Sequence, residues 1–266
     1  MTNPPTKMTR MPRLLLPAFL ILASAAFAPA QTPPPPAATV PADPIAKKKE
    51  LLFADDFQGP EAARDKRWHR VVDTFAFENG ALKGTQTREK DMPSADGKSV
   101  IKAHAAVYGL EVPTRDSVIE CKIRFEGASM IDVEFDDRKY AGSHYGHLSR
   151  AQIRPDRVTL LDEREGSQNL AVRELRLNPE TNKAEISRRL AGRSANFPAK
   201  FETGRWYVLV VETVGDEMRV TMDGKPVGYL KSPGIGHATK SKIELGVGGR
   251  DGWFDDIKVW NAEPAR

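Results

Sequence analysis

The chain has 266 residues and a formal net charge of +4, from 40 lysines and arginines against 36 aspartates and glutamates. Three of the basic residues and none of the acidic ones lie in the first 30 residues, so the remaining 37 basic and 36 acidic residues almost cancel. This balance argues against nucleic-acid binding, which depends on clustered positive charge.

Residues 1–30 have the pattern of an export signal. Three basic residues precede the apolar run 14–28, and residues 28–30 (Ala-Pro-Ala) have the small side chains that signal peptidase requires. The apolar run is shorter than the roughly 20 residues that span a bilayer, and no cysteine follows it to carry a lipid. We expect cleavage after Ala28 or Ala30, no membrane span in the mature protein, and a location in the periplasm or the extracellular space. An uncleaved membrane anchor is the alternative.

The next segment, residues 31–50, is rich in proline and contains a run of three lysines near its end. This composition predicts an extended linker that builds no core. The length that remains suits a single β-sandwich domain, which we place at residues 51–262, followed by a short tail at 263–266.

Alternation of apolar and polar residues dominates residues 51–262, and helical periodicity is scarce. Short segments of this kind, separated by turn dipeptides such as Asn79-Gly80 and Asp223-Gly224, predict an all-β fold with two antiparallel sheets. The expected strands, in chain order, are 51–57, 70–74, 81–85, 100–108, 118–125, 131–136, 147–154, 158–161, 206–213, 218–222, 227–230, 242–247 and 254–260.

One segment breaks the strand pattern. Asn178, Pro179 and Glu180 combine a helix N-cap, a first-turn proline and a first-turn acid, which predicts a helix that ends near Leu190. The expected helix is basic, which indicates either a solvated decoration of a long loop or a binding element.

Cys121 is the single cysteine, so no intramolecular disulfide is available. It alternates in step with Ile119 and Ile123 on the apolar face of its strand, which favours a buried structural thiol over a nucleophile. An exported protein without a disulfide must be held together by its core or by a metal.

Residues 130–137 (MIDVEFDD) place Asp132, Glu134 and Asp136 on one face of a strand, because the apolar residues between them share the other face. Three carboxylates on one sheet face repel one another, so the face must be solvated, compensated by cations or used in chemistry. Asp132 and Glu134 would lie about 6.5–7 Å apart at the backbone, a spacing that suits an inverting pair of carboxyl groups. These three are the candidate catalytic residues.

Aromatic and basic side chains follow this strand. Aromatic rings stack on the C–H faces of sugars, and planar polar groups read their hydroxyl groups. Local hydrogen bonding is the alternative role, and His144 with His147 would also allow a metal site beside Glu134 or Asp136. The candidate substrate-binding residues are Tyr140, His144, Tyr145, His147 and Arg150.

The two ends of the domain match those of a known family. LLFADDFQG (51–59), followed by Trp68, and GWFDDIKVW (252–260) resemble the opening DEFNG…W and closing VDYVRVY strands of laminarinase/lichenase glycoside hydrolases. FENGALKG (77–84) and the stretch 204–230 resemble two of their hairpins. The layout is also similar to secreted 3-keto-disaccharide hydrolase-like domains. The resemblance implies a concanavalin A-like jelly roll of two antiparallel sheets, and the helix predicted after Asn178 adds one short helix in a long loop.

The family carries E-x-D-x-E on one strand, with the outer glutamates as nucleophile and acid. At the matching positions this chain has Asp132, Glu134 and Asp136, the inverse order. Aspartates at both ends widen the gap beyond the roughly 5–5.5 Å of a retaining pair. The departure therefore concerns the enzyme assignment and leaves the expected fold untouched.

The resemblance also implies a structural Ca²⁺ held by Asp56, Asp255 and the carbonyl oxygen of Gly80, a set of hard oxygen ligands. Asp255 shares the parity of Ile257 and is therefore expected to face the core, where a carboxylate needs a cation. A salt bridge to Lys258, or simple exposure, is the alternative. No organic cofactor is expected.

We therefore expect an exported jelly-roll protein that binds or processes a saccharide or polysaccharide on its concave sheet. One alternative is a hydrolase of glycosides or 3-keto-glycosides that uses Asp132, Glu134 and Asp136. A second is a structural or cell-surface interaction protein without enzymatic activity.

Overall fold

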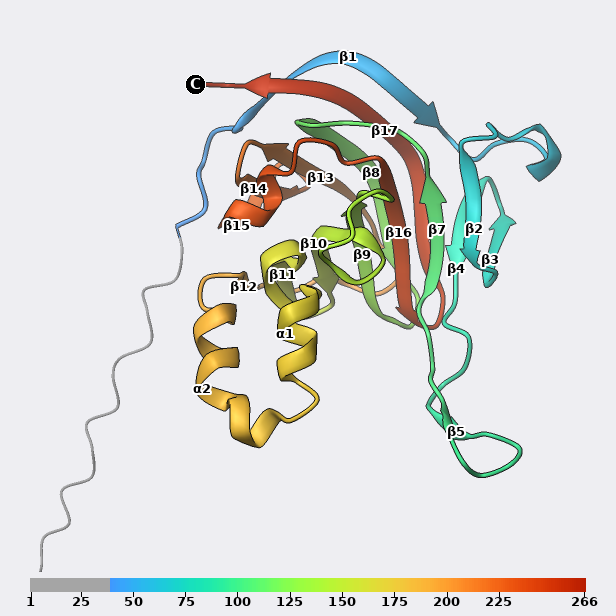
Figure 1. Ribbon diagram of the computed structural model, residues 1–266. Coiled ribbons are helices and arrows are strands. Elements are labelled where there is room, and N and C mark those ends of the chain that lie inside the picture. Colours follow the sequence, from blue (N-terminus) through green and yellow to red (C-terminus); the bar gives the residue numbers. More distant parts are fainter. Residues whose placement is uncertain (1–38) are drawn as a thin grey trace, which may run out of the picture. The chain divides into compact units, whose positions relative to one another are not determined.

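The computed structural model describes residues 39–266, so the expected export signal and most of the expected linker lie outside the described residues. Two large antiparallel sheets make up most of this part of the chain, as the alternation predicted (Figure 1). In the described residues, no helix has the length and apolarity needed to cross a membrane.

Sheet A forms one layer, and β1 (Ala46–Asp55) pairs with its strand β17. The path of sheet A runs through β15 (Lys225–Lys231), β14 (Glu217–Met222), β13 (Trp206–Val214), β8 (Ser117–Phe125), β17 (Gly252–Pro264), β4 (Ala81–Gly84) and β3 (Phe75–Glu78). Sheet B runs through β12 (Ser194–Pro198), β11 (Arg157–Asp162), β10 (His147–Arg154), β9 (Ala128–Asp136), β16 (Lys242–Gly249), β7 (Ala106–Leu110) and β2 (Trp68–Val72).

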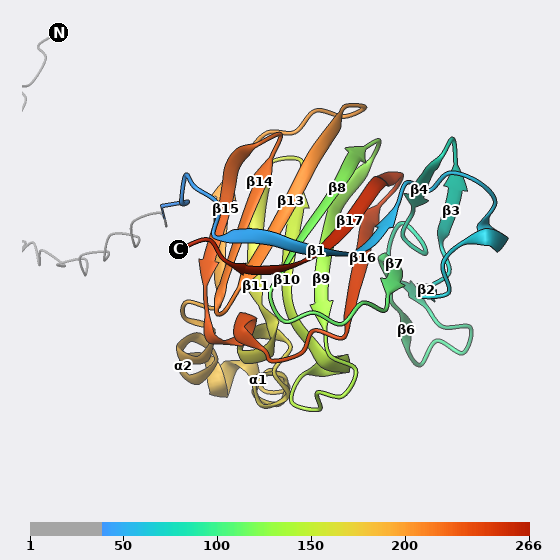
Figure 2. The same ribbon diagram turned by 90° about the horizontal axis from the view of Figure 1, so that it is seen from above.

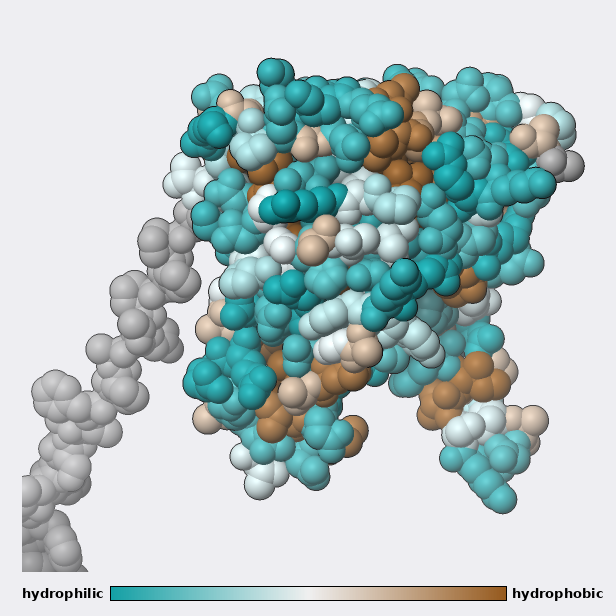
Figure 3. All heavy atoms as spheres, turned by 45° about the horizontal axis from the view of Figure 1, so that its top comes forward, coloured by the Kyte–Doolittle hydropathy of each residue, from teal (hydrophilic) through white to brown (hydrophobic). Residues whose placement is uncertain are grey.

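Smaller elements project beyond the two sheets. Figure 1 shows the helices below β10 to β12 and the small β5–β6 hairpin below β4 and β7. These elements are β5 (Met92–Pro93), β6 (Val100–Ile101), α1 (Leu170–Leu175), α2 (Pro179–Leu190) and the turns η1 (Glu61–Ala63), η2 (His144–Gly146), η3 (Glu163–Ser167) and η4 (Pro233–Gly236). Figure 3 shows that hydrophilic residues cover most of the visible face and that hydrophobic ones gather only in small patches.

The core lies between the two sheets and is built by one face of each strand. Ile131, Val133 and Phe135 of β9 are fully buried against residues of sheet A. Each such side chain stabilises the fold by about 1.5–3 kcal/mol through removal of apolar surface from water. Cys121 belongs to the same cluster, and burial raises the pKa of its thiol far above the usual value. The structural role predicted for Cys121 is confirmed.

The two ends of the domain lie side by side, as their sequences suggested. β1 and β17 are antiparallel, with Phe53 opposite Val259 and Asp55 opposite Ile257 (Figure 2). The expected boundaries need correction, because Ala46 already pairs with Pro264. Residues 46–50 therefore belong to the sheet and not to the linker, since the last residues of β17 supply their hydrogen-bond partners.

Two local expectations were wrong. The expected strand 100–108 is divided into β6 and β7, because Asp91 accepts hydrogen bonds from the Ala103 backbone (2.8 Å) and the Lys102 side chain (2.6 Å). The long loop holds a second helix, α1, whose first turn is capped by the Asn169 side chain. The helix expected after Asn178 is present as α2, and it buries no residue.

A buried ion pair fastens the segment before β1 to sheet A. Arg219 of β14 is 3% exposed, and its Nη1 lies 2.8 Å from Oε2 of Glu212 on β13. The same guanidinium donates to the carbonyl oxygens of Pro41 (2.9 Å) and Ala42 (2.7 Å). The guanidinium of Arg219 thus joins β13, β14 and the segment before β1.

We predict that Arg219→Ala lowers the free energy of unfolding by about 3–5 kcal/mol, because it leaves Glu212 buried without a cation. Urea denaturation measures this loss. Arg205→Ala is the matched control: Arg205 is 53% exposed at its side chain, pairs with Asp223, and should cost less than about 1 kcal/mol. Similar losses for the two variants would contradict the role of the buried pair.

Candidate functional site

The open face of sheet B carries a patch of charged side chains at its centre, where β10, β9 and β16 are neighbours. Glu134 of β9 stands in register between Arg150 of β10 and Glu244 of β16. Asp136, one pleat further along β9, stands between His147 and Lys242. The strand that fills the core with one face therefore presents its carboxylates on the other.

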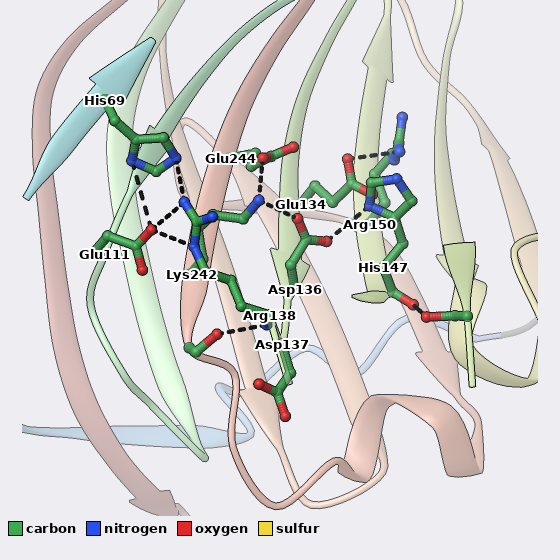
Figure 4. A network of polar contacts seen from close by, with 12 residues as sticks. His69, Glu111, Glu134, Asp136, Asp137, Arg138, His147, Arg150, Lys242 and Glu244 are labelled. Carbon is green, nitrogen blue, oxygen red and sulfur yellow. Dashed lines mark hydrogen bonds and ion pairs between the residues drawn. The ribbon is translucent and has the colours of Figure 1, made fainter. Parts of the chain in front are cut away.

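These carboxylates are compensated by cations. Although they line a sheet face, Asp132, Glu134 and Asp136 are 2%, 4% and 0% exposed. Figure 4 shows Lys242 approaching Asp136 from one side and His147 from the other. The distances are 3.1 Å from Lys242 Nζ to Asp136 Oδ2, and 3.0 Å from His147 Nδ1 to Asp136 Oδ1. Of the three alternatives given for this face, exposure of the carboxylates to solvent is therefore wrong, and compensation by cations is present.

Arg150 is the central cation. Its guanidinium lies 3.1 Å from Asp132, 2.6 Å from Glu134 and 3.3 Å from Glu163. Glu163 reaches it from η3, a turn that the buried Asp162 holds by accepting hydrogen bonds from the Glu165 backbone (2.9 Å) and from Ser232. Arg150 also lines the cavity described below, and its predicted role in substrate binding stays a prediction.

The patch contains more carboxyl groups than cations. Among residues 39–266, the carboxyl groups of Asp132, Glu134, Asp136, Glu163 and Glu244 form ion pairs with only three cations, Arg150, Lys242 and His147. Some of the carboxyl groups must therefore retain protons near neutral pH, because unpaired buried charges are strongly disfavoured.

The carboxyl groups differ in how readily they ionise. Burial tends to raise the pKa of Glu134, but Arg150 and His147 outweigh it and lower that pKa to about 2. Burial, opposed by Arg150 and reinforced by Glu134, raises the pKa of Asp132 to about 6. Burial also raises the pKa of Glu244 to about 7, and burial with Glu134 raises that of Glu163 well above its usual range. An ionised carboxylate beside protonated carboxyl groups is the arrangement of general acid and base catalysis.

A cavity of about 1140 Å³ opens above the patch. Asp132, Glu134 and Glu244 lie at its floor, while η2 and β2 contribute to its walls. Two glycines shape the floor: a Cβ at Gly246 would overlap the Asp132 carboxylate, and one at Gly109 would overlap the His69 ring. The volume exceeds the roughly 300–1,000 Å³ of common small-molecule pockets.

The predicted aromatic residues lie at the edge of this cavity. Tyr140, His144 and Tyr145 line it, and Tyr145 is 81% exposed. Tyr145 has a φ of 51°, a left-handed conformation that costs a residue other than glycine about 1–3 kcal/mol. Its ring centroid lies 4.3 Å from that of His144 and 6.3 Å from that of His147. The turn thus holds an aromatic ring in solvent despite backbone strain.

The sequence pattern missed three members of the patch: Lys242, Glu244 and Glu163. Lys242 and Glu244 alternate with the buried Ile243 and Leu245, so the parity argument applied to β9 would have found them. Glu163 lies in a turn and carries no periodic signal.

Glu134, His147 and Glu244 each bring one donor atom within 4.8 Å of the others, which is the geometry of a small metal site. The His147 ring is already engaged, because Nδ1 contacts both Glu134 (2.7 Å) and Asp136 (3.0 Å). Burial tends to lower the pKa of His147, but Asp136 and Glu134 outweigh it and raise that pKa to about 10. A protonated imidazole is a cation in its own right, so the arrangement fits an ion-pair network better than a metal centre.

The expected calcium ligands are satisfied by neighbouring groups. Gln58 Nε2 donates to the Gly80 carbonyl oxygen at 2.9 Å and to that of Asp56 at 3.3 Å, so a hydrogen-bond donor lies between these oxygens. The orientation expected for Asp255 was wrong. A bulge with Asp256 at φ 48° shifts the parity of β17, so Phe254 and Ile257 face the core and Asp255 is only half-buried. The calcium site stays a prediction.

No family model matches the chain, and no curated protein matches its sequence. Many solved structures match its fold. Porphyranase B from Zobellia galactanivorans superposes with a TM-score of 0.51 and 12% identity, over 89% of this chain and 98% of that one. The laminarinase catalytic domain from Thermotoga maritima superposes with a TM-score of 0.51 and 12% identity, over 81% of this chain and 99% of that one. An endo-β-galactosidase from Clostridium perfringens superposes with a TM-score of 0.53 and 13% identity, over 84% of this chain and 65% of that one.

The chain has a concanavalin A-like jelly-roll fold. The resemblance drawn from its two end strands is thereby confirmed. At 12–13% identity the superpositions establish the fold alone. Any chemistry of this protein has to be argued from its own residues.

We predict that His147 stays protonated well above pH 7, because Asp136 and Glu134 hold its charge. NMR titration of the imidazole signals measures this, with His144 as the internal control, since burial and Arg173 lower the pKa of His144. The contribution of His147 to stability should be complete below pH 6.5 and lost as the pH rises through about 10. A His147 midpoint below that of His144 would contradict the ion-pair network.

Proposed function

We propose that this protein binds and hydrolyses a saccharide in the cavity on the open face of sheet B. The observation that carries the proposal is the cluster of carboxyl groups at the cavity floor, whose members differ in the cations that they contact. Arg150 and His147 outweigh burial and lower the pKa of Glu134 to about 2, whereas burial raises the pKa of Asp132 to about 6 and that of Glu244 to about 7. Cleavage of a glycosidic bond needs a carboxylate and a carboxylic acid of this kind on one site.

The structural neighbours support a polysaccharide as the substrate class. By their names, a porphyranase, a laminarinase and an endo-β-galactosidase share this fold. The large open cavity agrees with a chain-like substrate. The proposal includes export through the signal at residues 1–30, since polysaccharides of this kind lie outside the cytoplasm.

Tyr145 is proposed to bind the sugar by stacking. Its ring is exposed at the cavity edge, next to His144, and backbone strain is maintained to keep it there. Strain that the fold retains at one exposed residue is typical of ligand-binding positions.

A second candidate function is binding without turnover. It is favoured by the contacts of Glu134, whose Oε1 faces His147 at 2.7 Å and whose Oε2 faces Arg150 at 2.6 Å. Oε1 has no hydrogen-bond partner among the described residues, so it is free to accept a hydrogen bond from a sugar hydroxyl group.

We predict that Glu134→Gln lowers turnover by about 10²–10⁴-fold, because it removes the ionised carboxylate. The assay measures reducing ends released from laminarin, lichenan, porphyran and 3-keto-glycosides. Glu263→Gln, at the far end of β17 in exposed ion pairs with Lys47 and Lys49, is the matched control and should retain activity. Binding to a glycan array without turnover by the wild type would support the second candidate, and neither binding nor turnover would sink both.

We predict that Tyr145→Gly weakens saccharide affinity up to about 10-fold, as expected for loss of an aromatic contact. It should also raise the free energy of unfolding, because glycine tolerates the positive φ. Isothermal titration and urea denaturation measure the two effects. Leu51→Ala, which removes an exposed apolar side chain from β1, should leave affinity unchanged. A loss of stability in Tyr145→Gly would contradict the strain argument.

A further inference from the structure

The outer carboxylates of β9 are poorly placed to act with Glu134 as a catalytic pair. Asp136 is fully buried between Lys242 and His147, and Asp132 is held across Gly246 by Arg150. Successive residues on the same face of a strand are about 6.5–7 Å apart, and aspartate side chains are short. A partner for Glu134 must therefore be sought on a neighbouring strand.

Glu244 occupies that position. It stands directly opposite Glu134 in the β9–β16 register, and residues so paired have Cβ atoms about 4.5–5.5 Å apart. Oxygen atoms of the two carboxyl groups lie within 4.8 Å of each other. This separation is close to the roughly 5–5.5 Å of retaining glycosidases and far below the roughly 6.5–9.5 Å of inverting ones.

The two glutamates contact different numbers of cations. Hydrolysis requires one ionised and one protonated carboxyl group, and such a difference favours that state. Glu134 contacts two cations of β10, Arg150 and His147, which favour its ionised form. Glu244 contacts one cation, Lys242 of its own strand, and Lys242 is shared with Asp136. Both glutamates line the same cavity.

We propose that Glu244 is the general acid and Glu134 the nucleophile, so that the catalytic pair spans β16 and β9 and does not lie along one strand. The inference rests on the proposed hydrolysis and names its residues.

In the first step a Glu134 oxygen forms a bond to the anomeric carbon of the sugar. The bond from that carbon to the departing oxygen breaks, and this oxygen keeps the electron pair and takes the proton of Glu244. In the second step the Glu244 carboxylate takes a proton from water, and the water oxygen displaces Glu134 from the anomeric carbon. One water is consumed, Glu244 is again protonated, and two inversions leave the configuration retained.

The titratable groups around Glu244 come from three strands. Lys242 lies on its own strand, Glu134 and Asp136 face it from β9, and His69 of β2 covers Gly109, its register partner on β7. Burial, reinforced by Asp136 and opposed by Lys242, raises the pKa of Glu244 to about 7. The acid form is thus populated up to neutral pH.

The test compares leaving groups. On the polysaccharide that the wild type hydrolyses, Glu244→Gln should lose about 10²–10⁴-fold in kcat/KM. On the 2,4-dinitrophenyl glycoside of the same sugar, whose leaving group needs no proton, formation of the glycosyl–enzyme should change less than about 10-fold. Sodium azide should then speed turnover by Glu244→Gln and yield a glycosyl azide of retained configuration. The alkaline limb of the wild-type pH profile should be absent in this variant.

Asp132→Asn and Asp136→Asn are the matched controls, with circular dichroism and thermal melting to check folding. Equal losses by Glu244→Gln on both substrates, a leaving-group dependence in either aspartate variant, or an inverted first product would overturn the assignment while hydrolysis by the wild type stands. Activity removed by EDTA and restored by Zn²⁺ or Mn²⁺ would also overturn it. A wild type that hydrolyses no glycan would remove the proposed function and this inference together.

Discussion

The ion pairs of Arg150 are the interaction on which the floor of the cavity depends. One guanidinium meets carboxyl groups from β9 and from η3, and it allows Glu134 to be nearly fully buried. Without such a partner, a buried carboxylate would cost several kcal/mol or would take up a proton. Because the cations do not balance all the carboxyl groups, the remaining ones differ in proton affinity. The floor therefore combines carboxyl groups with a lowered pKa, such as Glu134, and carboxyl groups with a raised pKa, such as Glu244.

The hydrophobic core of the jelly roll holds the strands that carry these carboxyl groups in fixed positions. The same strand, β9, fills the core with Ile131, Val133 and Phe135 and carries the carboxylates on its other face, so the rigid core positions the site directly. Sheet A backs this core, and the pairing of β1 with β17 ties the ends of the domain together. With a single cysteine, and hence no intramolecular disulfide, the fold relies on such packing and on buried ion pairs such as Arg219 with Glu212.

The fold of this protein resembles that of known enzymes, whereas the residues on its carboxylate strand differ from the family pattern. The jelly roll superposes on glycan-degrading enzymes, yet the strand that would carry their catalytic glutamates has aspartates at its outer positions. A cross-strand partner restores a short carboxyl–carboxyl distance by a different route, since register neighbours on adjacent strands are closer than residues two apart on one strand. Because the fold persists while the residues on its open face change, the function has to be argued from the site.

Local patterns in the sequence determined much of this protein. Period-two alternation located most strands but missed β3, β5 and β12, and it placed Asp132, Glu134 and Asp136 on one face, because side-chain parity along a strand depends only on neighbouring residues. The resemblance of the two end segments to a known family marked them as partners. Tertiary structure alone decided the rest. Which residues of β10 and β16 stand beside Glu134 depends on register between segments far apart in the chain, and a single bulge at Asp256 reversed the expected orientation of Asp255. Burial of the carboxylates, and hence their pKa values, follows from those neighbours and from no pattern within β9 itself.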